Sequence, residues 1–125
     1  MGLKLTNISE QGKFERERVV MRAEGETEIG DYAVFCCKAG SDGIPLSGAM
    51  IAGFWFQNKI IKDGDLLVLY SRAGLPSEKV NDGGHTSHFF YWGASEALWT
   101  TLRVAVLAET PSWQVSDPNR STSTD

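Results

Sequence analysis

Residues 65–115 constrain the fold of this chain more than any other segment. They contain an apolar run at 66–70, an aromatic run at 89–92 and a further apolar run at 102–107. Turn-forming residues separate these runs, including the sequence Gly-Ala-Ser at 93–95. Short runs of β-branched, aromatic and aliphatic residues between turn signals are typical of strands. The segment therefore predicts consecutive strands of an all-β domain.

The N-terminal half shows the same organisation. Val19, Met21 and Ala23 alternate with polar residues, which predicts a strand with one buried face. In residues 32–37 both alternating sets are apolar, so we expect this strand to lie inside a sheet or to be covered on both faces. Strands are predicted at 3–8, 15–23, 32–37, 54–56, 66–70, 89–92, 102–107 and 113–115.

Three segments do not read as strands. Residues 47–53 are rich in glycine and are predicted to form a loop with a little strand character. Residues 77–87 are polar and predict a mobile loop. Residues 94–98 are the only candidate helix, and they are too few for a helix that is stable alone. Seven or eight short strands then predict an antiparallel sandwich or barrel.

Size and composition set the class of protein. A chain of 125 residues with 42% hydrophobic residues predicts one domain, assigned to residues 1–115, with a polar tail at 116–125. No apolar run has the ~18 residues that a membrane span needs, and no export signal is visible, so no membrane role is expected. The formal charge of −4 disfavours nucleic acid as a partner.

The two cysteines, Cys36 and Cys37, are adjacent in the sequence. Neighbouring side chains on a strand point to opposite faces, so a disulfide between them would strain the backbone. Two packed, free thiols indicate a reducing compartment, and a cytoplasmic location is expected.

The order of these elements resembles a lamin tail domain. The resemblance rests on the strand 18–22, the strand 32–35, the aromatic strand 54–56 and the later Trp-Gly pair at 92–93, followed by Ser95, Trp99 and the strand 104–107. It implies an immunoglobulin-like antiparallel β-sandwich of seven to eight strands. It also implies that Trp92 and Trp99 pack in the core and that the domain docks protein partners.

Arginines on the strand 15–23 form the first candidate surface. Arg16, Arg18 and Arg22 share the polar face and could meet phosphates or a protein partner. Glutamates at 15, 17 and 24 lie beside them in the sequence, so we expect cross-strand ion pairs on a solvated face.

The polar loop is the second candidate. Asn81, Asp82, His85 and His88 could offer imidazoles and a carboxylate to a metal ion. Their spacing matches no recognised ligand set, so a solvated polar loop is favoured and no metal site is assigned.

Trp113 is the third candidate. Ser112 and Gln114 flank it, so it is the tryptophan expected to be exposed. Exposed coplanar rings that include Trp113 or Trp55 would favour stacking on a sugar, whereas buried rings belong to the core.

The residues support an interaction module rather than an enzyme. No nucleophile, base and orienting group are visible together, and no catalytic residue or cofactor is assigned. We expect a non-enzymatic domain that docks a protein partner or self-associates, through an exposed edge strand or a surface patch. A carbohydrate-binding module is the first alternative, and a small metal-binding protein or enzyme that uses residues 81–88 is the second.

Overall fold

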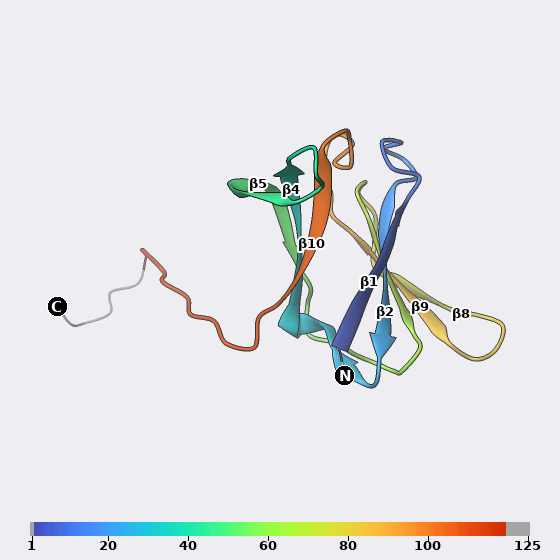
Figure 1. Cartoon of the computed structure of the whole chain (residues 1–125). Coiled ribbons are helices and arrows are strands. Elements are labelled where there is room, and N and C mark those ends of the chain that lie inside the picture. Colours follow the sequence, from blue (N-terminus) through green and yellow to red (C-terminus); the bar gives the residue numbers. More distant parts are fainter. Residues whose placement is uncertain (1, 120–125) are drawn as a thin grey trace.

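The computed structural model describes residues 2–119 and shows an immunoglobulin-like β-sandwich (Figure 1). Two sheets face each other, and these described residues contribute ten strands and one short 3₁₀ helix. The elements are β1 (Gly2–Ser9), β2 (Arg18–Glu24), β3 (Thr27–Glu28), η1 (Ile29–Asp31), β4 (Tyr32–Ala39), β5 (Pro45–Trp55), β6 (Ile60–Ile61), β7 (Leu66–Tyr70), β8 (Ser77–Val80), β9 (Thr86–Tyr91) and β10 (Arg103–Glu109).

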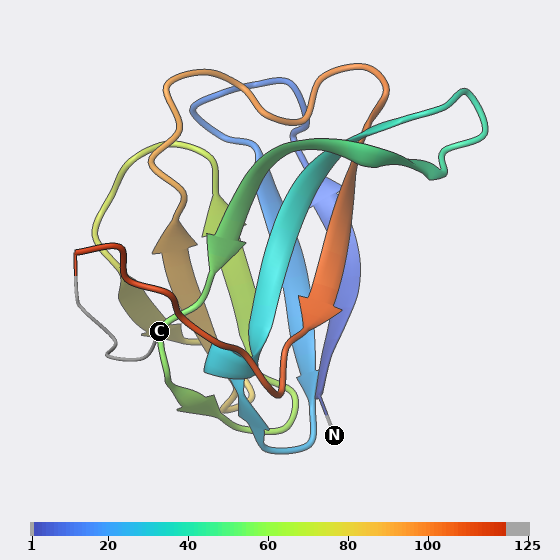
Figure 2. The same ribbon diagram turned by 90° about the vertical axis from the view of Figure 1, so that its left-hand side faces the viewer.

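One layer is a five-stranded sheet in the order β1-β2-β7-β9-β8, and the other is a three-stranded sheet in the order β10-β4-β5. Figure 2 views the molecule from the side of the three-stranded sheet, with β5, β4 and β10 next to one another in front. Strands β3 and β6 form a small third pair. All pairs are antiparallel except β7 and β9, because the chain leaves β7, forms the edge strand β8 and returns as β9 between the two.

The core lies between the two layers. Val19, Met21 and Ala23 of β2 are fully buried, which confirms the alternation predicted for this strand. Trp99 is 2% exposed and packs edge to face on half-buried Trp92, with ring centroids 6.0 Å apart. Both rings therefore belong to the core, as the resemblance implied.

Strand β4 is the middle strand of its sheet, as its two apolar faces predicted. Its inward positions, Tyr32, Val34 and Cys36, pack in the core. Both cysteines are free and buried. Burial raises the pKa of the Cys36 thiol to about 11, so this thiol stays protonated at neutral pH.

Several predictions of secondary structure were wrong. Residues 2–119 form ten strands rather than seven or eight, and residues 113–115 form no strand. Residues 47–53 lie within β5, where pairing with β4 outweighs the low strand propensity of glycine. Residues 77–87 form β8 and the turn into β9 instead of a loop without structure.

The remaining segments are short connections or irregular chain. Residues 94–98 form no helix, and within residues 2–119 no helix is long and apolar enough to cross a membrane. Of the tail predicted at 116–125, residues 120–125 lie outside the described part of the chain.

Candidate functional site

The outer face of the three-stranded sheet is apolar across all three strands. Side chains on directly paired residues share a face, so Ala33, Phe35 and Cys37 of β4 point away from the core together with their partners. Every one of these partners is apolar. We call this set the apolar face: Ala33, Phe35, Cys37, Met50, Gly53, Trp55, Val104, Val106 and Ala108.

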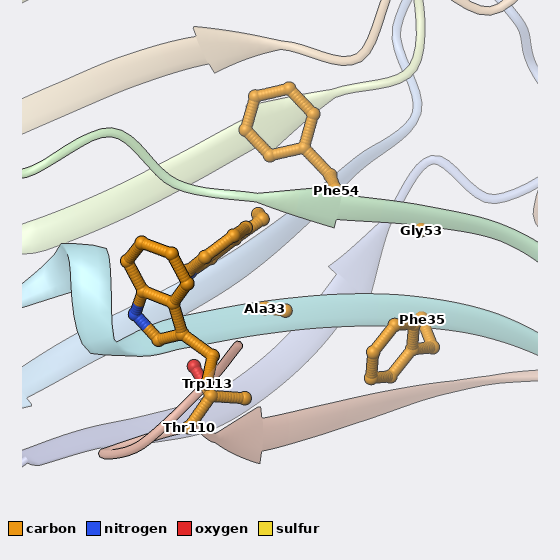
Figure 3. Close-up of a pocket in the computed structure, with 7 residues that line it drawn as sticks. Ala33, Phe35, Gly53, Phe54, Thr110 and Trp113 are labelled. Carbon is orange, nitrogen blue, oxygen red and sulfur yellow. The ribbon is translucent and has the colours of Figure 1, made fainter. Parts of the chain in front are cut away.

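A groove lies at one end of the apolar face (Figure 3). Trp55 forms one wall, and Trp113, from the segment after β10, packs edge to face against it with ring centroids 5.0 Å apart. The two indoles are 49% and 60% exposed, so Trp113 is exposed as predicted. The groove has a volume of about 280 Å³, and its lining is completed by Ala33, Phe35, Gly53, Phe54 and Thr110.

Hydrogen bonds hold both walls of the groove in place. The Trp55 indole N–H donates to the Gly30 carbonyl over 2.8 Å, which fixes the orientation of the ring. The Thr110 backbone N–H and hydroxyl both donate to the Asp31 carbonyl, which ties the segment carrying Trp113 to η1. The groove is therefore formed before any ligand arrives, which lowers the entropy lost on binding.

Gly53 keeps the floor of the groove open. A Cβ atom at this position would lie 3.0 Å from the Phe35 ring. A larger side chain there would push Phe35 aside and occupy the groove itself.

Strand β5 borders the apolar face and is an edge strand. The other three edge strands of the two layers carry charged residues, namely Lys4 in β1, the pair Glu78 and Lys79 in β8, and residues 103 and 109 in β10. Strand β5 carries none from Pro45 to Trp55. Charges on edge strands hinder pairing with another chain, and β5 lacks this protection. Pro45 and the register shifts beside Cys37 interrupt the first part of the strand, so residues 52–55 form its regular open edge.

The arginines predicted to pair with neighbouring glutamates do not do so. Arg18 and Arg22 share the outer face of β2, whereas Arg16 lies in the turn before the strand. Among residues 2–119, no ion pair involves any of these three arginines. The expectation of cross-strand pairing was therefore wrong, because one of the proposed partners, Glu17, is buried on the opposite side.

Glu17 is the polar residue that the sequence did not reveal. Its carboxylate is fully buried and accepts hydrogen bonds from the Ser71 hydroxyl over 2.5 Å, the Leu98 N–H over 2.7 Å and the Gly12 N–H over 2.9 Å. The Trp99 N–H contributes a longer contact of 3.4 Å. One side chain thus joins three connecting segments that are distant in the sequence.

The residues of the predicted polar loop divide into two groups. Asn81 closes the turn between β8 and β9, because its side-chain amide donates to Ser87 and its backbone N–H donates to the His85 carbonyl. Asp82 is exposed in this turn. The exposed side chain of His85 lies against Gly64, where a Cβ atom would be 2.6 Å from its Nε2.

His88, in contrast, is buried beside Asp65. Its Nε2 lies 2.9 Å from Asp65 Oδ2, and its Nδ1 lies 3.7 Å from Glu78 Oε2. Lys59 in turn hydrogen-bonds Glu78 and holds the pKa of that carboxyl below its usual range. Within residues 2–119, no three side chains of His, Cys, Asp or Glu are grouped as metal ligands. His88 therefore hydrogen-bonds the 62–65 turn through Asp65, whereas its buried Nδ1 has no hydrogen-bond partner among the described residues.

The ionisation of the Asp65 carboxyl makes the stability of the fold depend on pH. Burial alone would raise the pKa of its carboxyl, but hydrogen bonds from His88 and from the backbone N–H groups of Thr86 and Lys62 outweigh burial and lower it. The contribution of this carboxylate is complete above the unfolded pKa of about 3.9 and is lost as the pH falls through the lower folded pKa. We expect the difference in unfolding free energy between the wild type and Asp65→Asn to be constant above about pH 5 and to shrink below about pH 4.

Urea denaturation from pH 3 to pH 7 measures this difference. Asp82→Asn is the matched control, because it removes an exposed carboxylate from the neighbouring hairpin. A gap between wild type and Asp65→Asn that widens in acid would contradict the role given to Asp65.

Comparison with known proteins assigns no family to this chain. The chain matches no model of a known protein family, and it has no match among curated proteins. The functional argument therefore rests on the residues and the surfaces described above.

Proposed function

We propose that this chain is a non-enzymatic β-sandwich interaction module that docks a protein partner. The observation that carries the proposal is the apolar face, which ends in an aromatic groove and is bordered by β5, the one edge strand of the two described layers that carries no charge. Apolar surface of this extent, next to an open sheet edge, is typical of protein interaction sites.

The partner is an extended apolar segment of another protein. Such a segment pairs its backbone with the free edge of β5 and places alternate side chains over the apolar face, with one in the groove beside Trp55 and Trp113. The three-stranded face is about 14 Å wide, because neighbouring strands lie about 4.8 Å apart. Over the eight residues of β4 the face is about 26 Å long, so its area is roughly 360 Å². This area suits one added segment better than a standard interface, in which each partner buries ~800 Å².

Two further assignments belong to the same proposal. The lamin-tail-like character of the domain is supported by the sandwich fold and by the core positions of Trp92 and Trp99. A cytoplasmic location is supported by the free thiols of Cys36 and Cys37.

Peptide display on the immobilised chain, followed by fluorescence anisotropy of the selected peptides, tests the proposal. We expect Met50→Lys to weaken binding at least about tenfold, since it places a charge on the apolar face beside β5. Met50 is 57% exposed, so the substitution spares the core. Val80→Lys is the matched control, because Val80 is 71% exposed on the opposite edge strand, β8.

The outcomes separate the proposal from its alternatives. Equal binding to Met50→Lys and to the wild type would overturn it, as would failure to select any peptide. If the wild type forms a dimer at high concentration and Met50→Lys stays monomeric, the partner on β5 is a second copy of this chain and not a segment of another protein.

The carbohydrate alternative has weaker support. Trp55 and Trp113 are both exposed, but their rings meet at 84° and present no common plane for a sugar. The Trp55 indole N–H is also occupied by the Gly30 carbonyl. A glycan panel that shifts the tryptophan fluorescence, where no peptide does, would favour this alternative instead.

A further inference from the structure

The outer face of the five-stranded sheet is a second surface, with a different character. Directly paired residues form three rows across its strands. Cations stand in the first and third rows, and the three central strands place apolar side chains in the second. We call these rows, together with Arg72, the basic face. The first row is Ser9, Arg18, Tyr70 and Tyr91; the second is Asn7, Val20, Val68, Phe89 and Ser77; the third is Lys4, Arg22, Leu66, Ser87 and Lys79.

Two guanidinium groups of the basic face rest on aromatic rings. The guanidinium carbons of Arg18 and Arg72 lie 5.6 Å and 4.9 Å from the centroid of the Tyr70 ring. Arg72 also lies 5.1 Å from the centroid of Tyr91, whose ring stacks on Tyr70 at 5.4 Å. Cation–π contacts of this kind hold guanidinium groups in place without neutralising their charge.

Backbone carbonyls fix the same two groups further. Arg72 Nε donates to the Glu15 carbonyl over 3.1 Å, and Arg18 Nη1 donates to the Arg16 carbonyl over 2.8 Å. A guanidinium has five N–H donors, so most donors of both groups are left for a ligand. The two groups are thus oriented before binding, which reduces the entropy lost when they bind an anion.

The cations of the basic face are not neutralised by direct ion pairs. Within residues 2–119, none of its cations forms an ion pair. Lys4 and Arg22 stand directly opposite each other on β1 and β2, an arrangement in which like charges repel. Glu24 lines a hollow with both of them but lies beyond ion-pair distance of either. An anion from outside would relieve this repulsion.

We propose that the basic face binds a short acidic segment of a protein partner in extended conformation. Arg18 and Arg22 are four residues apart on one strand, which separates the two charged rows by about 13 Å. An extended segment has the same rise, so carboxylates four residues apart reach both rows while an apolar side chain between them covers Val20 and Phe89. The net charge of −4 repels long polyanions such as nucleic acid or an anionic membrane, which favours the short segment.

Calorimetric titration with a synthetic peptide tests this site. The probe has the sequence Ser-Asp-Ser-Leu-Ser-Asp-Ser with both ends blocked, and its control has Asn in place of both Asp residues. We expect the acidic peptide to bind and the Asn peptide to bind at least about tenfold more weakly. Raising the salt from about 0.05 M to about 0.5 M should weaken binding of the acidic peptide further.

Substitutions assign the binding to the basic face. The double variant Arg18→Gln/Arg72→Gln should lower the affinity at least about tenfold, and Arg22→Gln, which changes an exposed side chain, should lower it by a smaller factor. The double variant Lys38→Gln/Lys62→Gln removes the same charge from exposed positions elsewhere and should change the affinity by less than about twofold. Circular dichroism checks that each variant is folded.

The outcomes decide between this site and the alternatives. Equal losses in the two double variants would show a general charge effect and overturn the proposal, and so would absence of binding to the wild type. Tighter binding of a single-stranded oligonucleotide than of the peptide would assign the face to nucleic acid instead. Met50→Lys should leave peptide binding unchanged, so this proposal and the one for the apolar face fail independently.

Discussion

Replacing Glu17 with Ala is expected to lower the free energy of unfolding by about 3–5 kcal/mol, because it leaves several buried donors without an acceptor. The buried carboxylate accepts hydrogen bonds from the backbone N–H groups of Leu98 and Gly12 and from the Ser71 hydroxyl. Water cannot easily replace it at Leu98, which is 6% exposed. Urea denaturation followed by tryptophan fluorescence measures the loss.

Glu15→Ala is the matched control for Glu17→Ala. Glu15 is exposed, and its contact to Arg72 uses the backbone carbonyl, which the substitution retains. Its effect should stay within about 0.5 kcal/mol. If the two glutamate variants were equally stable, the claim that Glu17 joins three segments would be wrong.

The second large effect is expected at Trp99. Replacing this 2% exposed indole with Ala should lower the free energy of unfolding by about 3–5 kcal/mol, because it opens a cavity beside Trp92. Its indole N–H is buried with no hydrogen-bond partner among the described residues. Trp99→Phe removes this unpaired donor, so it should cost less than half as much as Trp99→Ala.

Trp113→Ala tests whether Trp113 belongs to the binding groove, in contrast to Trp99, which belongs to the core. Trp113 is 60% exposed and contacts Trp55 at its edge, so its loss should cost less than about 1 kcal/mol. The same substitution should weaken binding of the peptides selected on the apolar face. A Trp113→Ala protein as unstable as Trp99→Ala would place Trp113 in the core and remove the argument for the groove.

The fold class followed from local pattern, because alternation determines which side of a strand is buried. In β2 and β4 this was sufficient to assign both faces correctly, down to the opposite orientations of Cys36 and Cys37. The end of strand β5 was predicted at residues 54–55, but residues 45–53 were missed because their glycines hide a strand that exists through pairing with β4. Strand β8 was missed because all four of its residues are exposed. Its sequence therefore lacks the alternation of apolar and polar residues that marks a strand with one buried face.

The candidate sites were harder to predict than the fold. The exposure of Trp113 followed from its polar neighbours, but the groove depends on the register that sets Trp55 opposite Ala33 and on the contact of Thr110 with Asp31. Both are long-range relations that a single sequence does not contain. The burial of Glu17 is of the same kind, since the sequence around it resembles an exposed charged strand.

On the basic face, the burial of Glu17 changes how the neighbouring arginines are interpreted. Arg18 and Arg22 were expected to be neutralised by nearby glutamates, and the sequence order supported that view. Once Glu17 turns into the core and β7 supplies Tyr70, Arg18 rests on an aromatic ring instead of pairing with a carboxylate, and Arg22 stands opposite Lys4. A strand that appeared to be a solvated ion-paired face thus becomes a candidate site for an acidic segment.

The central claim is that a partner segment adds to β5 and fills the groove beside Trp113. Nuclear magnetic resonance of the ¹⁵N-labelled chain, titrated with a peptide selected on the apolar face, tests it most directly. We predict that the largest shift changes fall on the amides of residues 50–55 and on the indole N–H groups of Trp55 and Trp113, with slower amide exchange along β5. Changes confined to the hairpin of β8 and β9, with β5 unaffected, would contradict the claim.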